Sequence, residues 1–196
     1  MIFVTVGAQM PFDRLISTVD EWAGRVSTEI FAQIGPTKLR PRHIQWIRFL
    51  EPAGFLSHID SADLLVAHAG MGSIITALEH SKPLLIMPRR GDLGETRNDH
   101  QVATARRFQE LGLVHVAYDE HELTDKLDRL ASRATSNGTD EVLCPHRSTG
   151  CAWIGSIACQ PHAGSACPHL IDSLRGFVVD AHVPRLSMPK GNVSPL

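Results

Sequence analysis

A turn between an apolar segment and a helical segment carries the residues best suited to bind an anion. Residues 64–67 are apolar, residues 68–73 read HAGMGS, and a helix is predicted to begin at Ser73 or just before it. Amide groups at a helix N-terminus have no partner within the helix, and with the helix dipole they attract negative charge. Gly70 and Gly72 allow a ligand to approach the backbone closely. The pattern predicts a phosphate or diphosphate site that uses no dedicated lysine.

A second polar segment follows the next predicted strand. Leu84–Met87 is an apolar run between two prolines, and the loop after it is rich in Arg, Asn, Asp, His and Gln. Ligands of open parallel sheets bind beyond the carboxyl ends of the strands. Both polar segments leave carboxyl ends, so we expect them to converge on one polar ligand. Each also has a plainer interpretation, because a Gly-x-Gly turn can be a turn and nothing more, and His68 can be a structural histidine.

The elements that must position these loops alternate along the first two-thirds of the chain. Strands are predicted at residues 2–6, 29–34, 44–50, 64–67, 84–87 and 114–117, and helices at 11–26, 55–61, 73–80, 99–111 and 120–134. The helices are predicted from apolar residues that recur at helical spacing, as they do in residues 11–26. Such alternation is typical of parallel strands joined by right-handed crossovers. The predicted fold is therefore α/β, a doubly wound, Rossmann-like parallel sheet over residues 1–134.

Composition narrows the class of protein. Hydrophobic residues make up 43% of the 196 and charged residues 20%, values of a globular domain. The formal net charge of −2 argues against nucleic acid as the main partner. We find no apolar run of membrane-spanning length and no secretory signal at the N-terminus. A cytoplasmic protein is expected, placed at the inner face of the membrane through a partner.

The sequence changes character near residue 135. Residues 136–139 read SNGT, like a linker, and all four cysteines lie beyond them in short Cys/Pro/His units. Three interpretations stay open for residues 135–196: a zinc site, a disulfide framework, and an irregular, poorly ordered extension, such as a shifted reading frame would produce. Paired zinc-ligand spacing is absent, and disulfides are rare in the cytosol. We therefore expect an irregular C-terminal tail and no metal.

The two polar segments together resemble a known family. The HAGxGS turn, the KP pair at residues 82–83 and the NDHQ segment at 98–101 are similar to the C-terminal domain of family 28 glycosyltransferases. The segments VTVGAQ at 4–9 and PFDRL at 11–15 are similar to the start of the small soluble subunits of two-part transferases. RxDHQ together with MPRR resembles most the bacterial exopolysaccharide branch. The resemblance covers roughly residues 1–130.

This resemblance implies the donor-binding half of a GT-B glycosyltransferase, a hexosyltransferase that uses a UDP-sugar. It implies no cofactor and no tightly held metal, because the helix terminus takes the place of the ion, and the sequence has no Asp-x-Asp motif. The residues implied to bind the donor are Gly7, Ala8, Gln9, His68, Gly70, Met71, Gly72, Ser73, Thr76, Arg89, Asn98, Asp99, His100 and Gln101.

Roles within this set follow from chemistry. The amides of residues 70–73, the Ser73 hydroxyl, and Arg89 or Arg90 would stabilise the leaving diphosphate, and His100 and Gln101 would contact sugar hydroxyls. The two arginines can equally be solvated loop charges. Residues 98 and 99 can equally cap the following helix.

Two positions depart from the family pattern. Ala8 stands where related chains commonly carry Thr, which removes one hydroxyl contact near the donor. Thr76 stands where the transferase that forms lipid II has an acid for the ribose hydroxyls. Because Thr can bond one hydroxyl but not two, ribose recognition is expected to be weaker or to come from elsewhere.

The resemblance also implies a second component. Enzymes of this fold close a cleft between an acceptor domain and a donor domain, so a separate membrane-associated polypeptide is expected to bind a lipid-linked saccharide acceptor. No general base is assignable in this chain. Two rival functions stay open: a non-catalytic helper that stabilises a membrane-bound transferase, and a sugar-nucleotide epimerase, which the chain length disfavours because an epimerase needs both domains.

Overall fold

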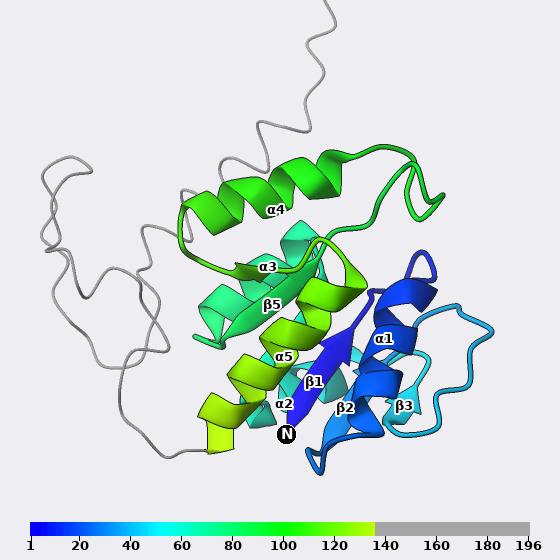
Figure 1. Ribbon diagram of the computed structural model, residues 1–196, viewed down its shortest axis with the longest axis vertical. Helices are drawn as coiled ribbons and strands as arrows, with labels where there is room; N and C mark the ends of the chain where they lie inside the picture. The colour runs from blue at the N-terminus through cyan, green and yellow to red at the C-terminus, as the bar shows by residue number, and fades with distance from the viewer. Residues whose placement is uncertain (136–196) are drawn as a thin grey trace, which may run out of the picture.

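Six short strands form one parallel sheet within residues 1–135, the part of the chain that the computed structural model describes (Figure 1). The strands are β1 (Ile2–Thr5), β2 (Ile30–Gln33), β3 (Gln45–Ile47), β4 (Leu64–His68), β5 (Leu84–Met87) and β6 (His115–Val116). Their order across the sheet is β3-β2-β1-β4-β5-β6, and every neighbouring pair is parallel. Strands β1 and β5 are buried along their whole length, and β4 is buried up to its last residue, His68, as expected of a parallel sheet covered on both faces.

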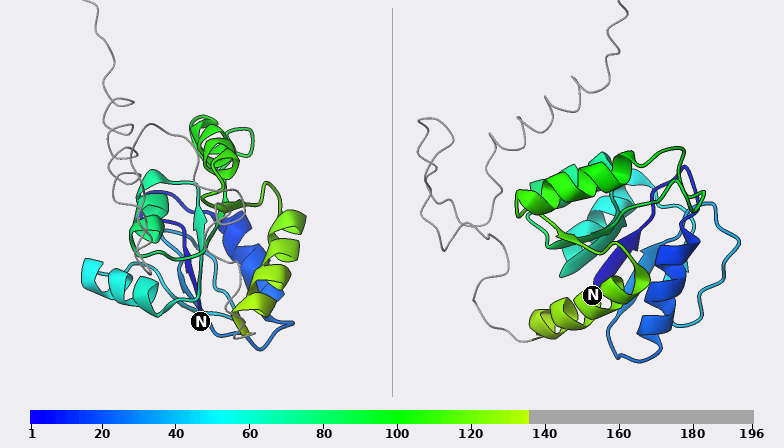
Figure 2. Two further views of the ribbon diagram at one scale, coloured as in Figure 1. Left: turned by 90° about the vertical axis from the view of Figure 1, so that its left-hand side faces the viewer. Right: turned by 45° about the horizontal axis from the view of Figure 1, so that its top comes forward.

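Five helices cover the two faces of this sheet. They are α1 (Asp13–Ala23), α2 (Pro52–Ser61), α3 (Met71–Glu79), α4 (His100–Glu110) and α5 (Glu120–Thr135). In the left-hand view of Figure 2, α1 and α5 lie on one side of the sheet, and α2 and α3 lie on the other. The buried residues of α4 share the core of α2 and α3. This arrangement confirms the predicted doubly wound α/β fold.

Two apolar cores result, one on each face of the sheet. Ile2 and Val4 of β1 belong to the core beneath α1 and α5, whereas Phe3 belongs to the opposite core. This alternation follows from the period of two along a strand. On α1, apolar residues at helical spacing, such as Leu15 and Trp22, are almost fully buried, which is why the helix docks by that face.

All the predicted strands and helices are present, and the differences lie at their ends. The first helix begins at Asp13 and ends at Ala23, so it is shorter than predicted at both ends. The second begins earlier than predicted, at Pro52, because proline suits the first helical turn. The third begins at Met71 rather than Ser73, after an extended Gly70. No helix within residues 1–135 is long and apolar enough to cross a membrane. The predicted tail lies outside the described residues.

The strand order places a reversal between β1 and β4. The chain moves outward from β1 through β2 to β3, and then returns to pair β4 with the other side of β1. In sheets of this kind the crevice at the carboxyl ends of the two central strands binds ligands. The loops that follow β1 and β4 begin at these strand ends, and they are two of the three loops predicted from the sequence to bind the donor; the third follows β5.

Candidate functional site

The turn after β4 presents the start of helix α3. Gly70 occupies the N-cap position with extended backbone (φ −90°, ψ 137°), and no side chain caps the helix. Its amide donates to the carbonyl of His68 at 2.8 Å, and the first helical bond runs from the Ile74 amide to the Gly70 carbonyl at 3.1 Å. The amides of residues 71–73 therefore have no acceptor within the helix. This end of α3 has the geometry that binds anions.

The two glycines of this turn differ in their surroundings. A Cβ added to Gly70 would lie 2.3 Å from Nε2 of His68, so any larger residue there would displace the imidazole, and packing alone favours glycine. A Cβ added to Gly72 would meet no described atom within 4 Å. Packing within residues 1–135 therefore does not explain Gly72, which leaves the backbone of the first turn of α3 accessible.

His68 joins the loop after β4 to the loop after β1. Gly7 has a φ of +75°, in the left-handed region that favours glycine. A Cβ at Gly7 would lie 3.0 Å from Cε1 of His68. Gly35, which the sequence reasoning did not identify, packs beneath this turn, since its Cβ would lie 2.9 Å from the Gly7 carbonyl oxygen. The predicted first turn and the predicted anion site therefore meet at one imidazole, at the reversal point of the sheet.

Burial keeps His68 uncharged. Burial and, to a lesser extent, the nearby Arg89 guanidinium lower the pKa of the imidazole to about 4, against a smaller opposing effect of the Thr5 backbone. Nδ1 has no hydrogen-bond partner among the described residues. A neutral imidazole of such low basicity is a poor proton acceptor at neutral pH. It is suited to bind or orient a ligand.

The structure gives Arg89 a place inside the protein. Its side chain is 3% exposed, and Nη2 donates to the carbonyls of Val6 at 2.8 Å and Met10 at 2.7 Å. The guanidinium carbon also lies 5.1 Å from the centre of the Phe12 ring. The alternative interpretation of Arg89 as a solvated loop charge is therefore wrong. Its hydrogen bonds join the loop after β1 to the loop after β5, and contact with the donor stays a prediction.

Arg90 has the opposite environment to its neighbour. Its guanidinium is exposed and forms an ion pair with Asp92 at 2.6 Å. This pair raises the pKa of Arg90 and lowers the pKa of Asp92. Arg90 therefore matches the interpretation as a loop charge, paired within its own loop.

The NDHQ segment enters helix α4, and its members have different roles. Asp99 occupies the N-cap position, but its carboxylate does not cap α4; it accepts from the amide of Gly91 at 2.8 Å. Asn98 Oδ1 accepts from the backbone amide of His100 at 3.4 Å and contacts its imidazole Nδ1. Capping by Asp99 is thus wrong, because the side chain closes the loop instead.

His100 and Gln101 do not form a matched pair. His100 is exposed, whereas Gln101 is 7% exposed. The Gln101 Oε1 accepts from the backbone amide of Arg89 at 3.1 Å, which fixes the start of α4 to the end of β5. Gln101 is therefore held by the fold, and His100 is free to face solvent.

Thr76, on α3, is bonded within its own helix. It donates its hydroxyl to the Gly72 carbonyl at 2.9 Å, which leaves its oxygen as an acceptor.

Other predicted residues lie around the same edge. Ala8 and Gln9 are exposed in the loop after β1, Ser73 is half-buried, and Met71 packs against the core of α2 and α3. A groove of about 380 Å³ lies between α1 and α5, and its lining includes none of the predicted donor-binding residues. Residues 1–135 contain no cluster of three His, Cys, Asp or Glu side chains placed to hold a metal ion.

Comparison with known proteins identifies the family. Residues 1–141 match the model of the glycosyltransferase family 28 C-terminal domain. The chain belongs to this family. It is 40% identical over 104 residues to the UDP-N-acetylglucosamine transferase subunit ALG13 of Eremothecium gossypii. The match covers 49% of this chain and 45% of the relative, so the chain spans less than half the length of that protein.

Two solved structures share the fold. MurG of Acinetobacter baumannii has a TM-score of 0.51 at 17% identity, and the match covers 67% of this chain and 41% of MurG. The kitacinnamycin glycosyltransferase has a TM-score of 0.50 at 22% identity, covering 67% of this chain and 34% of the enzyme. These likenesses confirm the predicted GT-B-type fold. The family resemblance predicted from the two sequence motifs is likewise confirmed.

Proposed function

We propose that this chain is the donor-binding part of a UDP-sugar glycosyltransferase. Membership of a glycosyltransferase family supports this role, and so does the name of the relative as a UDP-N-acetylglucosamine transferase subunit. The observation that carries the proposal is the start of α3. Its free amides and open Gly72 backbone lie beside His68, where the sheet reverses. A diphosphate is the ligand that such a helix terminus suits best.

The finer proposal concerns the acceptor and the partner. The sugar is transferred to a polyprenyl-diphosphate-linked saccharide in exopolysaccharide biosynthesis, and a membrane-associated subunit binds that acceptor. The RxDHQ and MPRR segments support the bacterial pathway. The description of the relative as a subunit supports a divided enzyme. The chain would act in the cytoplasm, at the inner face of the membrane.

The geometry suggests how donor binding would assist transfer. As the anomeric bond breaks, negative charge grows on the leaving diphosphate, and preorganised amides at α3 would stabilise that charge. His68, uncharged at neutral pH, would orient the ligand without adding a charge of its own. His100, exposed at the start of α4, would contact the sugar hydroxyls. The proton of the acceptor hydroxyl would go to a base outside this set.

Substitution of Gly72 tests the proposal. Gly72→Val places a branched side chain where the diphosphate would approach the backbone, and we expect UDP affinity to fall more than about tenfold. Gly54→Val is the matched control, since Gly54 lies in the first turn of α2 with room for a Cβ. Calorimetric titration with UDP measures both variants.

The outcomes separate the candidate functions. A folded Gly72→Val variant that binds UDP as tightly as the parent would contradict the donor site. A parent chain that binds no UDP would favour the helper function, in which the chain stabilises a membrane-bound transferase.

A further inference from the structure

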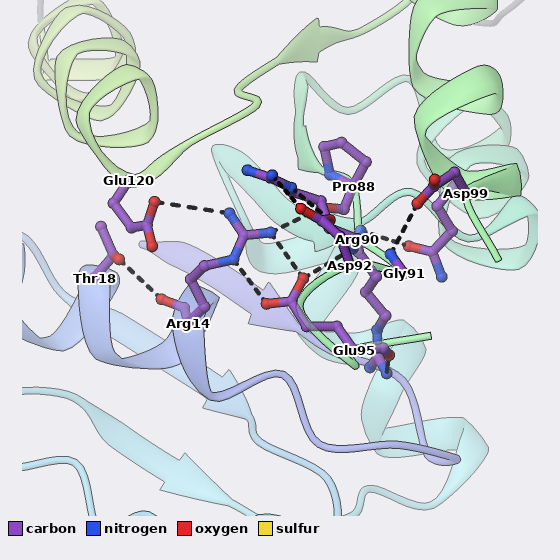
Figure 3. A network of polar contacts seen from close by, with 11 residues as sticks. Arg14, Thr18, Pro88, Arg90, Gly91, Asp92, Glu95, Asp99 and Glu120 are labelled. Carbon is purple, nitrogen blue, oxygen red and sulfur yellow. Dashed lines mark hydrogen bonds and ion pairs between the residues drawn. The ribbon is translucent and has the colours of Figure 1, made fainter. Parts of the chain in front are cut away.

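Arg14 and Glu95 form a two-pronged ion pair outside the predicted site. Arg14 Nε donates to Glu95 Oε1 at 2.7 Å, and Nη2 donates to Oε2 at 2.9 Å (Figure 3). Their side chains are 11% and 12% exposed. Such bidentate pairs are strong and fix geometry in two directions. The pair joins the first turn of α1 to the middle of the loop between β5 and α4, residues 88–99.

The same two side chains also hold the start of that loop. Arg14 Nη2 donates to the Pro88 carbonyl at 3.1 Å, and Glu95 Oε2 accepts from the Arg90 amide at 2.9 Å. The Glu95 amide in turn donates to the Arg90 carbonyl at 3.1 Å. Glu95 therefore folds the loop on itself and fixes it to α1 with one carboxylate.

The loop transmits this position to the start of α4. The Gly91 amide bonds to the Asp99 carboxylate at 2.8 Å, and the Arg89 amide bonds to Gln101 at 3.1 Å. His100 lies between these two attachment points in the sequence. A shift of residues 88–95 relative to α1 would therefore move His100 relative to the start of α3.

We propose that Arg14 and Glu95 are positioning residues for the sugar of the donor. The ion pair sets where the loop of residues 88–99 lies against α1. It therefore also sets where His100 meets the sugar of a donor whose diphosphate is bound at the start of α3. This inference rests on the proposed function. A pair this poorly exposed adds little net stability, because removing both charges from water offsets much of their attraction. Its main effect is to select one loop position.

The test compares variants of this pair with controls in the same network. Glu95→Gln removes the charge, and Arg14→Lys keeps the charge but removes the fork. Asp92→Asn is the control within the loop, because Asp92 pairs with Arg90 at the surface. Glu120→Gln is the control for Arg14. The exposed Glu120 carboxylate lies 3.8 Å from Nη1 of Arg14 but belongs to α5 rather than to the loop.

Two measurements on the full chain are needed. The first is hydrogen exchange of the Arg90 and Gly91 amides without ligand, and the second is titration with UDP and with UDP-glucose, UDP-galactose, UDP-N-acetylglucosamine and UDP-glucuronic acid. The ratio of affinities for the best UDP-sugar and for UDP isolates the sugar contribution. For both pair variants we expect faster exchange and a ratio about tenfold lower, with the two controls unchanged.

The outcomes distinguish this inference from the proposed function. Pair variants with an unchanged ratio would overturn the positioning role, whether or not exchange becomes faster, because a purely structural pair would alter exchange but not the ratio. A parent that binds the sugars no better than UDP would also overturn it. A parent that binds none of these nucleotides would overturn the proposed function as well. If Glu95→Gln does not fold, Arg14→Lys decides.

Discussion

At the residue scale, the burial of His68 links the candidate site to the stability of the fold. Its pKa in the folded chain is about 4, lowered first by burial and then by Arg89, against 6.5 for an ordinary histidine. Below pH 6.5 the unfolded chain takes up a proton that the folded chain refuses until about pH 4. The stabilisation is therefore complete above pH 6.5 and is lost as the pH falls toward 4.

Replacing His68 should remove this part of the pH dependence. Between pH 7 and pH 5 we expect the parent to lose about 2 kcal/mol more unfolding free energy than the His68→Asn variant. Urea unfolding at the two pH values measures the difference. Parallel losses in the two proteins would show that this histidine is not kept neutral by the fold.

The neighbours His100 and Gln101 give a second prediction at this scale. Gln101→Ala leaves the buried Arg89 amide without its acceptor, and the unfolding free energy should fall by about 1–3 kcal/mol. His100→Ala alters an exposed side chain and should change stability by less than about 0.5 kcal/mol. The His100 variant should weaken UDP-sugar binding and leave UDP binding nearly unchanged. Chemical unfolding and calorimetric titration test both effects, and equal weakening of the two ligands would place His100 outside the sugar site.

At the scale of elements, one hydrogen bond ties the two helices on the same face of the sheet. Trp22 on α1 is 1% exposed, and its indole Nε1 donates to Oδ1 of Asp128 on α5 at 2.7 Å. A buried indole N–H without a partner is costly. The bond therefore fixes the position of α5 along α1, in addition to the apolar contacts by which both helices pack on the sheet.

Loss of this bond should be measurable against a near neighbour. Asp128→Ala should lower the unfolding free energy by about 1–3 kcal/mol, because the Trp22 N–H stays buried without an acceptor. Asp125→Ala is the control, since Asp125 is exposed and pairs with the exposed His121. We expect the control to change stability by less than about 0.5 kcal/mol in the same urea unfolding experiment. If the Asp128 variant is as stable as the control, the bond does not contribute to holding α5 against α1.

The elements were predictable because each has a local pattern, whereas contacts between distant side chains have none. The spacing of Leu15 and Trp22 marks the buried face of α1, and prolines bound β5. The Arg14–Glu95 pair joins residues 81 positions apart, and no periodicity indicates it. Likewise, Arg89 and Arg90 look alike in the sequence, yet one is buried and the other exposed, since Arg89 bonds to carbonyls of the loop after β1 whereas Arg90 pairs with Asp92 in its own loop.

At the scale of the whole molecule, the candidate site depends on loops from three strands. Gly7 after β1, His68 at the end of β4 and Arg89 after β5 hold these loops together. All of them lie within the region matched by the family model, residues 1–141. Donor binding should therefore require this region and nothing beyond it. Transfer should in addition require the acceptor-binding partner.

Truncation and reconstitution test these two requirements. A chain ending at residue 141 keeps the whole family match and removes all four cysteines, which begin at Cys144. We expect it to stay folded and to bind UDP with the affinity of the full chain, with or without a chelator, because the predicted donor contacts are all retained. Neither form should transfer sugar to a lipid-linked acceptor until the membrane partner is added. Transfer by the purified chain without a partner would contradict the proposal that the enzyme is divided between two polypeptides. Unfolding of the truncated chain would show that the C-terminal residues belong to the core, and it would reopen the zinc interpretation.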